Sequence, residues 1–198
     1  MIKAIIFDLN GVFIQSPYLS ERVKEKFGVS TEEFLPALKA IMDKVRKPDA
    51  GASFDYWKPY LEKWGIKSNQ EEFFHFWFSE GKELVEMIGL ARELKDKGIK
   101  IFILSNNFKE RSEYYKKHFP FLDELFDEVY YSWQTGFVKP DPMAYENLLK
   151  ENNLKPEECM YFDDSEKNIE AASTLGIQSF IFKDAQETKQ ILKQNKVL

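Results

Sequence analysis

The sequence is poor in several kinds of residue and segment, and each shortage excludes a class of protein. Cys159 is the single cysteine among 198 residues, so the chain forms no internal disulfide, which is typical of a reducing compartment. Every apolar stretch is much shorter than the ~18 residues of a membrane-spanning helix. The N-terminus lacks the basic segment, apolar segment and cleavage site of a signal peptide. We therefore expect a cytoplasmic protein without a membrane segment.

Basic residues are also in short supply. The chain has 28 Lys and Arg against 33 Asp and Glu, which gives a formal net charge of −5. No basic stripe is present, so we expect no nucleic-acid partner, although one or two local cations could hold a small anion. Core material is abundant, since 43% of the residues are hydrophobic and 16% are aromatic. This composition is typical of a globular protein with a sizeable core.

Five short apolar runs recur along the chain and predict the strands of a parallel sheet. They cover residues 3–9, 100–105, 128–132, 159–163 and 178–182. Helices are predicted at 83–97, 108–118, 141–152, 165–175 and 186–195, with Asp141 and Ser165 as N-caps. Strands and helices that alternate in this way favour an α/β fold with a doubly wound parallel sheet.

One interval interrupts this alternation. Roughly 70 residues separate the first strand from the helix predicted at 83, far more than the 2–6 residues of an ordinary βα loop. Helix-start signals at 30–33 and 68–71, with helical periodicity over 34–45 and 72–80, predict a small helical domain here. We therefore divide the chain into an α/β core, residues 1–13 and 83–198, and an inserted helical cap, residues 14–82. A hinge is expected at 12–17 and 80–90.

Polar side chains stand where four of the predicted strands end. The first strand leads into DLNG (8–11) and the second into SNN (105–107), while the third leads to Lys139 and the fourth into DDS (163–165). Ligands of open α/β sheets bind at this edge. Carboxylates from two strands would repel each other unless a hard cation such as Mg²⁺ lay between them. Ser105 and Lys139 could hold phosphate oxygens.

Together these segments resemble the four motifs of the haloacid dehalogenase-like (HAD) hydrolase superfamily. The motifs read FDLNGV at 7–12, LSNN at 104–107, VKPDPMAY at 138–145 and YFDDSEKNIEAASTLG at 161–176. Each residue alone has an ordinary structural explanation, but their order at successive strand ends makes the set specific. The resemblance implies a Rossmann-type core with a helical cap between the first two motifs. It also implies phosphatase chemistry similar to that of sugar-phosphate phosphatase-like members.

The resemblance assigns the reacting groups. Asp8 matches the nucleophile that attacks phosphorus and forms an aspartyl-phosphate, which water then hydrolyses. Ser105 matches the hydroxyl that binds the phosphoryl group, and Asn106 lies beside it as a further donor. Lys139 matches the cation that neutralises charge between the nucleophile and the phosphate. These four residues are the expected catalytic and substrate-binding set, together with Asn10.

The resemblance also implies a Mg²⁺ site. Asp8 and Asp164 match its acidic ligands, and Asn10 stands where the family contributes a backbone carbonyl. Asp163 is a second acidic residue that ligates directly, ligates through water, or orients Asp164. Asn168 falls where related members have a polar residue that supports this loop and the lysine.

Asn10 departs from the family pattern. Most phosphatases of the family have a second aspartate here, which protonates the leaving group and then activates water. An amide has no titratable proton, and losing a general acid and base typically slows turnover ~10²–10⁴-fold. Four explanations stay open. Asn10 belongs to a natural subgroup with another proton donor or good leaving groups, or it is an introduced Asp-to-Asn change. Alternatively, the protein binds phosphate and Mg²⁺ without turnover, or it is a 2-haloacid dehalogenase, although metal-free dehalogenases do not need the acidic pair at 163–164.

The main expectation is a Mg²⁺-dependent phosphatase of a small phosphorylated metabolite, acting as a monomer or homodimer. Substrate choice should lie in the cap, because the sheet-edge residues contact only the phosphoryl group. Arg46 could meet a distal anion there, although exposed arginines on helical segments are mostly solvated. The candidates for substrate selection are Phe13, Gln15, the segment 42–47, Phe54 and Trp57.

Overall fold

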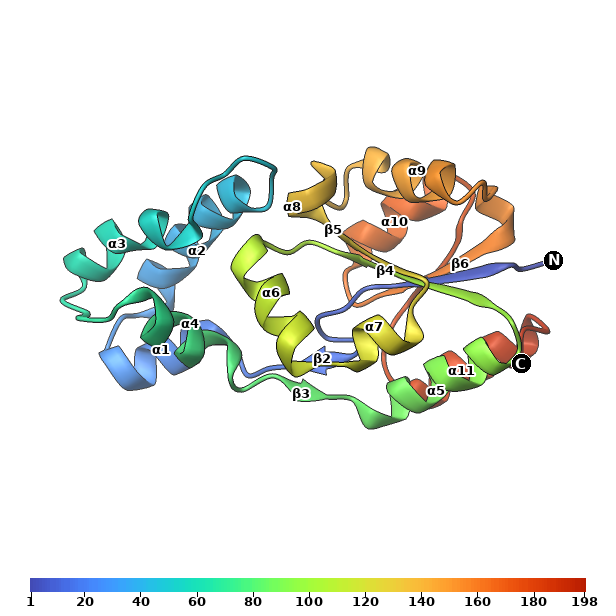
Figure 1. The fold of residues 1–198 in the computed structure, drawn as a ribbon, viewed down its shortest axis with the longest axis horizontal. Coiled ribbons are helices and arrows are strands. Elements are labelled where there is room, and N and C mark those ends of the chain that lie inside the picture. The colour runs from blue at the N-terminus through green and yellow to red at the C-terminus, as the bar shows by residue number, and fades with distance from the viewer.

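A five-stranded parallel sheet forms the centre of the larger half of the molecule (Figure 1). The computed structural model describes all 198 residues. The strands are β1 (Ala4–Phe7), β4 (Lys100–Ser105), β5 (Glu128–Tyr131), β6 (Cys159–Asp163) and β7 (Gln178–Ile181), in the order β5-β4-β1-β6-β7. Every neighbouring pair is parallel. The expected doubly wound α/β sheet is confirmed.

Helices cover both faces of this sheet, as Figure 1 shows. One face packs on α5 (Val85–Asp96), α6 (Lys109–His118), α7 (Phe121–Leu125) and α11 (Ala185–Gln194), and the other on α9 (Pro142–Glu151) and α10 (Glu166–Thr174). In β1, Ile5 and Phe7 enter the first hydrophobic cluster, whereas Ala4 and Ile6 enter the second. Successive strand side chains point to opposite faces, so a strand covered on both faces is apolar throughout.

The N-caps of two helices that follow the sheet differ from each other. The Asp141 side chain accepts a hydrogen bond from Met143 N and caps α9 as predicted. Ser165 occupies the N-cap position of α10, but its side chain makes no capping hydrogen bond. Its backbone N–H donates instead to Asp163 Oδ1 at 2.8 Å, so the carboxylate two residues earlier satisfies this turn.

The smaller half consists of four helices, to the left in Figure 1. They are α1 (Leu19–Phe27), α2 (Thr31–Val45), α3 (Ser53–Lys63) and α4 (Gln70–Phe78). Ser30 caps α2, and Asn69 forms a capping box with Glu72 at the start of α4. The other two helices lack a side-chain cap, which left no start signal in the sequence. No helix in either half combines the length and apolarity that crossing a bilayer requires.

An aromatic cluster fills the centre of the helical half. Trp57 is fully buried, with its ring 5.7 Å from Phe34 and 5.1 Å from Phe73 between centroids. Phe108, which immediately precedes α6, also belongs to this cluster, and its ring lies 5.3 Å from that of Trp77. Tyr114 of α6 packs against the same cluster, 5.4 Å from the ring of Phe78, so the sheet half contributes two aromatic side chains to the hydrophobic core of its neighbour.

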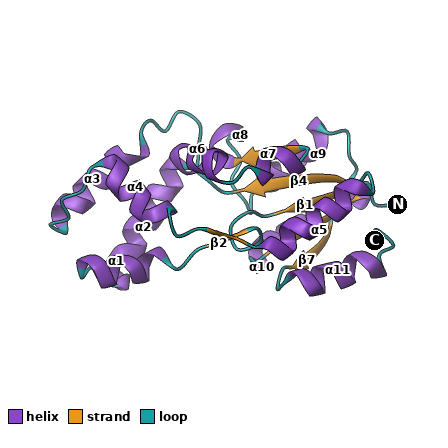
Figure 2. Ribbon diagram, turned by 60° about the horizontal axis from the view of Figure 1, so that its bottom comes forward, coloured by secondary structure: helices purple, strands orange, loops and turns teal.

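Two chain connections join the halves, and Figure 2 shows them between the four helices and the sheet. They pair as the short antiparallel strands β2 (Ile14–Gln15) and β3 (Lys82–Glu83). Residue 83 is thus a strand residue, and the helix predicted from 83 begins at Val85. Gly89 lies inside α5, so the hinge that we propose is confined to the two connections. The division into a core and a cap at 14–82 stays our proposal.

Candidate active site

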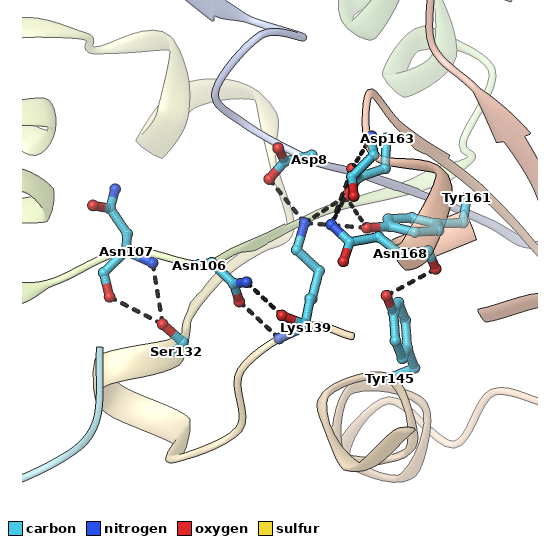
Figure 3. A network of polar contacts seen from close by, with 10 residues as sticks. Asp8, Asn106, Asn107, Ser132, Lys139, Tyr145, Tyr161, Asp163 and Asn168 are labelled. Carbon is cyan, nitrogen blue, oxygen red and sulfur yellow. Dashed lines mark hydrogen bonds and ion pairs between the residues drawn. The ribbon is translucent and has the colours of Figure 1, made fainter. Parts of the chain in front are cut away.

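The sequence-predicted polar residues converge at the carboxyl ends of β1, β4 and β6. Figure 3 shows the Lys139 side chain reaching between Asp8 and Asp163. Its Nζ donates to Asp8 Oδ1 at 2.9 Å and to Asp163 Oδ2 at 2.7 Å. Lys139 and Asp163 are buried, and Asp8 is almost completely buried. Residues from three distant parts of the sequence therefore form one ion network.

The pKa values of Lys139 and Asp8 depend on two opposing influences, burial and the charges of neighbouring groups. Burial alone would lower the pKa of Lys139, but the adjacent carboxylates of Asp8 and Asp163 outweigh it and raise that pKa. Burial raises the pKa of Asp8 to about 6, with Lys139 working against the rise and Asp163 adding to it. At neutral pH the lysine is therefore protonated and Asp8 is mainly ionised, the form that a nucleophile requires.

Asp163 is surrounded by protein donors. Its Oδ2 accepts hydrogen bonds from Lys139 and from the Tyr161 hydroxyl, and Asn168 Nδ2 lies 3.1 and 3.0 Å from its two oxygens. Together with the bond from Ser165, these contacts engage both carboxylate oxygens. The arrangement suits Asp163 to holding the lysine and the loop in place, one of the roles left open for it by the sequence.

Asp164 is placed differently, because it is exposed and lies against Gly11. Gly11 has φ +87°, and a Cβ at this position would lie 2.5 Å from Asp164 Oδ2. A glycine is required here on both grounds, since other residues rarely adopt this φ and no space exists for a side chain. The turn after β1 and the acidic loop after β6 therefore approach each other closely.

Three carboxylates meet at this point. Oxygen atoms of Asp8, Asp163 and Asp164, one from each, all lie within 4.8 Å of one another. Like charges at such distances repel, and the pKa of Asp164 is raised by partial burial and by the charge of Asp163. Carboxylate oxygens are the ligands that Mg²⁺ prefers, so this donor set fits a hard divalent cation.

Ser105 and Asn106 point to different tasks. Ser105 is buried, and its Oγ has no hydrogen-bond partner in the protein, so the hydroxyl is available to an oxygen of a ligand. The Asn106 side chain accepts from Lys139 N at 2.8 Å and donates to Lys139 O at 2.7 Å. The Asn106 side chain therefore bonds to both the backbone N–H and the backbone carbonyl of Lys139. It positions the lysine backbone rather than donating to a substrate.

Asn10 is held by a residue that the sequence did not indicate. The Tyr115 hydroxyl of α6 donates to Asn10 Oδ1 at 2.7 Å across 105 positions of sequence. Burial raises the pKa of Tyr115, so the phenol stays protonated as a donor. No local pattern marks Tyr115. Tyr161 could have been found, because it lies two residues before Asp163 on β6 and so faces the same side of the sheet.

A cleft of about 700 Å³ opens beside these residues. Gln15, one of the predicted selection residues, lines it. Phe13 does not, because it is fully buried in the sheet half, 5.3 Å from the ring of Phe7. Trp57 is enclosed in the helical half, and Phe54 lines a separate hollow along α3. The lining residues are Asn10, Gly11, Asp164, Ile14, Gln15, Ser16, Pro17, Tyr18, Glu21, Trp77, Glu80, Lys82 and Arg111.

Two curated proteins align with almost the whole of this chain at 27–28% sequence identity. A phosphorylated carbohydrates phosphatase of Thermotoga maritima is 28% identical over 185 residues, covering 89% of this chain and 83% of that protein. Acyl-CoA dehydrogenase family member 10 of Mus musculus is 27% identical over 193 residues, covering 89% of this chain but 17% of the mouse protein. The chain spans little more than half, or less, of the first curated relatives that it matches.

Solved structures and a family model identify the fold. A HAD family enzyme of Bacteroides thetaiotaomicron, in complex with magnesium and inorganic phosphate, superposes with a TM-score of 0.79 at 21% identity, covering 93% of this chain and 96% of that one. The family model for haloacid dehalogenase-like hydrolases matches residues 2–176, which include all four motifs. The chain therefore belongs to the haloacid dehalogenase-like hydrolase family.

Proposed function

We propose that this protein is a Mg²⁺-dependent phosphomonoesterase that acts on a small phosphorylated metabolite through an aspartyl-phosphate on Asp8. The observation that carries the proposal is the buried Lys139 ammonium bonded to both Asp8 and Asp163, with Asp164 completing a set of three carboxylates. A lysine held against an ionised nucleophile at a metal-binding edge supplies the electrostatic stabilisation on which phosphoryl transfer depends.

In the first step of this mechanism, an Asp8 oxygen forms a bond to phosphorus while the bond from phosphorus to the leaving oxygen breaks. Lys139 offsets the negative charge that Asp8 and the phosphoryl group bring together, and Ser105 Oγ donates a hydrogen bond to a phosphoryl oxygen. Asp8, Asp164 and the Asn10 backbone carbonyl would hold Mg²⁺, with Asp163 behind them, and the ion supplies further charge neutralisation. Water then hydrolyses the aspartyl-phosphate and regenerates Asp8.

Asn10 determines which leaving groups suit this site. With its Oδ1 accepting from Tyr115, the Asn10 amide nitrogen remains as a hydrogen-bond donor but has no proton to transfer. The leaving oxygen must therefore depart with little protonation or take a proton from another source. The relative from Thermotoga maritima is named for phosphorylated carbohydrates, and a leaving group of that size suits the cleft.

The test compares the given sequence with Asn10→Asp and Asp8→Ala in the hydrolysis of p-nitrophenyl phosphate with Mg²⁺. We expect Asp8→Ala to be inactive with p-nitrophenyl phosphate. In a parallel assay with an alkyl phosphate such as glycerol 3-phosphate, Asn10→Asp should be faster by about 10²-fold, because it restores a general acid and base. Asn10-Gly11 is prone to deamidation, so the mass of this peptide must be checked in each sample.

Two results would contradict the proposal. Release of chloride from 2-chloropropionate, with no phosphate ester hydrolysed by the given sequence or by Asn10→Asp, identifies a dehalogenase. No turnover of either kind, with phosphate and Mg²⁺ still bound, identifies a binding protein.

A further inference from the structure

Two arginines near the candidate active site have no anionic partner. Arg46 directly follows α2, and Arg111 lies in the first turn of α6. Neither takes part in any ion pair of the structure. The Nε atom of each is buried without a hydrogen-bond partner. Both arginines are only half-buried, but a buried N–H group is normally paired, so these two Nε atoms point to an acceptor outside the chain.

Arg111 lines the same cleft as Asn10, Gly11 and Asp164. Its guanidinium lies over the ring of Tyr115, 5.1 Å from the centroid, and Tyr115 in turn bonds to Asn10. Tyr115 thus links Arg111 to Asn10, the position where the family resemblance places the group that protonates the leaving oxygen. Stacking on an aromatic ring orients a guanidinium while leaving its N–H groups available.

Arg46 approaches the site from the helical half. The loop that follows it is docked on the sheet half, where Pro48 lies 3.6 Å from the position of a Cβ on Gly136. A second contact joins this loop to α6: Ser53 N donates a hydrogen bond to Oε1 of Glu110 at 2.7 Å. Glu110 directly precedes Arg111 in the sequence. Burial and the positive charge of Arg111 lower the pKa of Arg46, while the charges of Asp8 and Asp43 oppose this shift.

The other arginines differ from this pair. Arg22 donates to the backbone carbonyls of Phe76 and Trp77 and so serves the packing of the helical half. Arg92 is mostly exposed on α5, 3.9 Å from Glu124. The transferred phosphoryl group already has Lys139 and the Ser105 hydroxyl as dedicated partners. Arg46 and Arg111 are therefore available to a different anionic group.

We propose that Arg46 and Arg111 form a subsite for a second anionic group, a carboxylate or a second phosphate, on the leaving-group side of the substrate. The subsite rests on the proposed phosphatase function and narrows it to phosphorylated acids or bisphosphates. Planar guanidinium groups match both anions through paired N–H donors. One arginine belongs to each half, so a doubly anionic substrate would also hold the two halves together.

The first experiment uses matched substrates. Glycerol 3-phosphate and 3-phosphoglycerate both lose phosphate from a primary alcohol and differ in one carboxylate, and fructose 6-phosphate with fructose 1,6-bisphosphate tests a second phosphate. We expect kcat/KM to be at least tenfold higher for the more anionic member of at least one pair. The pair that shows this preference distinguishes a carboxylate from a phosphate. The measurement is made with the given sequence and with Asn10→Asp.

Substitutions of the two arginines test whether they cause the preference for the more anionic substrate. Arg46→Gln and Arg111→Gln should each lower kcat/KM for the preferred substrate about tenfold, mainly through KM, and change its less anionic partner less than threefold. Arg46→Lys and Arg111→Lys should restore part of the loss. Arg92→Gln is the matched control and should leave both substrates unchanged.

A binding measurement separates this subsite from the proposed function. In Asp8→Ala, which cannot form the aspartyl-phosphate, calorimetry should show at least tenfold tighter binding of the more anionic substrate, and Arg111→Gln in this background should abolish the difference. Equal affinities, or equal losses for both members of a pair, would overturn the subsite. The hydrolysis of p-nitrophenyl phosphate would then still decide the phosphatase activity on its own.

Discussion

The charged groups on two sides of the candidate active site differ in how their charges are satisfied. On one side, Lys139 bonds to Asp8 and Asp163. On the other, Arg46 and Arg111 have no ionic partner within the protein. We call the first group, with Tyr161 and Asn168, the paired floor, and the two arginines the open roof. The floor is organised by the fold before any ligand arrives, whereas the roof is complete only with an anion.

The difference follows from where the residues lie. Asp8, Tyr161 and Asp163 stand on or directly after neighbouring strands of one sheet, where pairing such as Phe7 with Phe162 fixes their relative positions. Lys139 and Asn168 are in turn bonded to Asp163. The roof depends on the docking of a loop of the helical half against α6, which is made by a few contacts such as that of Ser53 with Glu110. Rigid hydrogen-bonded strands position groups more accurately than a joint between two halves.

The largest expected effect comes from breaking the floor. Lys139→Met leaves the carboxylates of Asp8 and Asp163 without their cation, and removing one partner of a buried ion pair costs about 3–5 kcal/mol. Denaturant unfolding should show this loss, whereas Lys24→Met, at an exposed position of α1, should stay within about 0.5 kcal/mol of the parent. Equal stability of the two variants would show that the floor is not held by its ion pairs.

A smaller loss is expected from crowding the floor. Gly11→Ala places a Cβ against Asp164 at a φ of +87° and should lower the free energy of unfolding by about 1–3 kcal/mol. Gly89→Ala, on an open position of α5 with no atom within 4 Å of the new Cβ, should raise it by about 0.5–1 kcal/mol. Thermal unfolding of the two variants measures whether each gains or loses stability. A stabilising effect of Gly11→Ala would contradict the close approach of Gly11 to Asp164.

Mg²⁺ should raise the free energy of unfolding by an amount similar to, or smaller than, the loss expected for Gly11→Ala. A cation bound only by the folded state adds about 1.4 kcal/mol at a concentration tenfold above its Kd, because it relieves the repulsion among three carboxylates. The melting temperature should therefore rise with Mg²⁺. Asp164→Asn should abolish the rise, and Asp96→Asn on exposed α5 should keep it. A rise that persists in Asp164→Asn would place the cation elsewhere.

The smallest effect is expected in the roof. Arg46→Gln and Arg111→Gln remove charges that form no ion pair, so neither variant should lower the free energy of unfolding by more than about 0.5 kcal/mol. Denaturant unfolding without substrate checks this against Lys139→Met. A loss of several kcal/mol in either variant would mean that the arginine is already paired in the free protein and that the two sides of the candidate active site do not differ.

The floor was largely predictable from the sequence, and the roof only in part. Asp8, Ser105 and Asp163 stand at the ends of recognisable apolar runs, and parallel strands bring such positions to one edge whatever the details of packing. Lys139 lies further along the chain and was assigned through the family motif. Arg111 carries no such signal, because its approach to Asn10 depends on how α6 docks. Arg46 was named from the sequence as a candidate for contacting an anion, against the general rule that arginines on helical segments are mostly solvated.

Two predictions about substrate selection were wrong. Phe13 follows the first motif closely, which favoured a role in substrate selection, yet it fills the core of the sheet half against Phe7 and Phe126. Trp57 lies in the helical half, where selection was expected, but it forms the centre of that half. Proximity in sequence to a site or a cap does not indicate which way an aromatic side chain points, because burial decides it.

The position of Phe108 implies a mechanical linkage. Its ring is inserted among Phe74, Trp77 and Phe78 of the helical half, although it stands only three residues after Ser105. Withdrawing a buried phenylalanine into water costs about 1.5–3 kcal/mol, so a tilt of the helical half would pull this residue along rather than release it. The hinge that we propose would therefore move Phe108 with the helical half, while the pairing of Ser105 with Tyr131 keeps the Ser105 hydroxyl with the sheet.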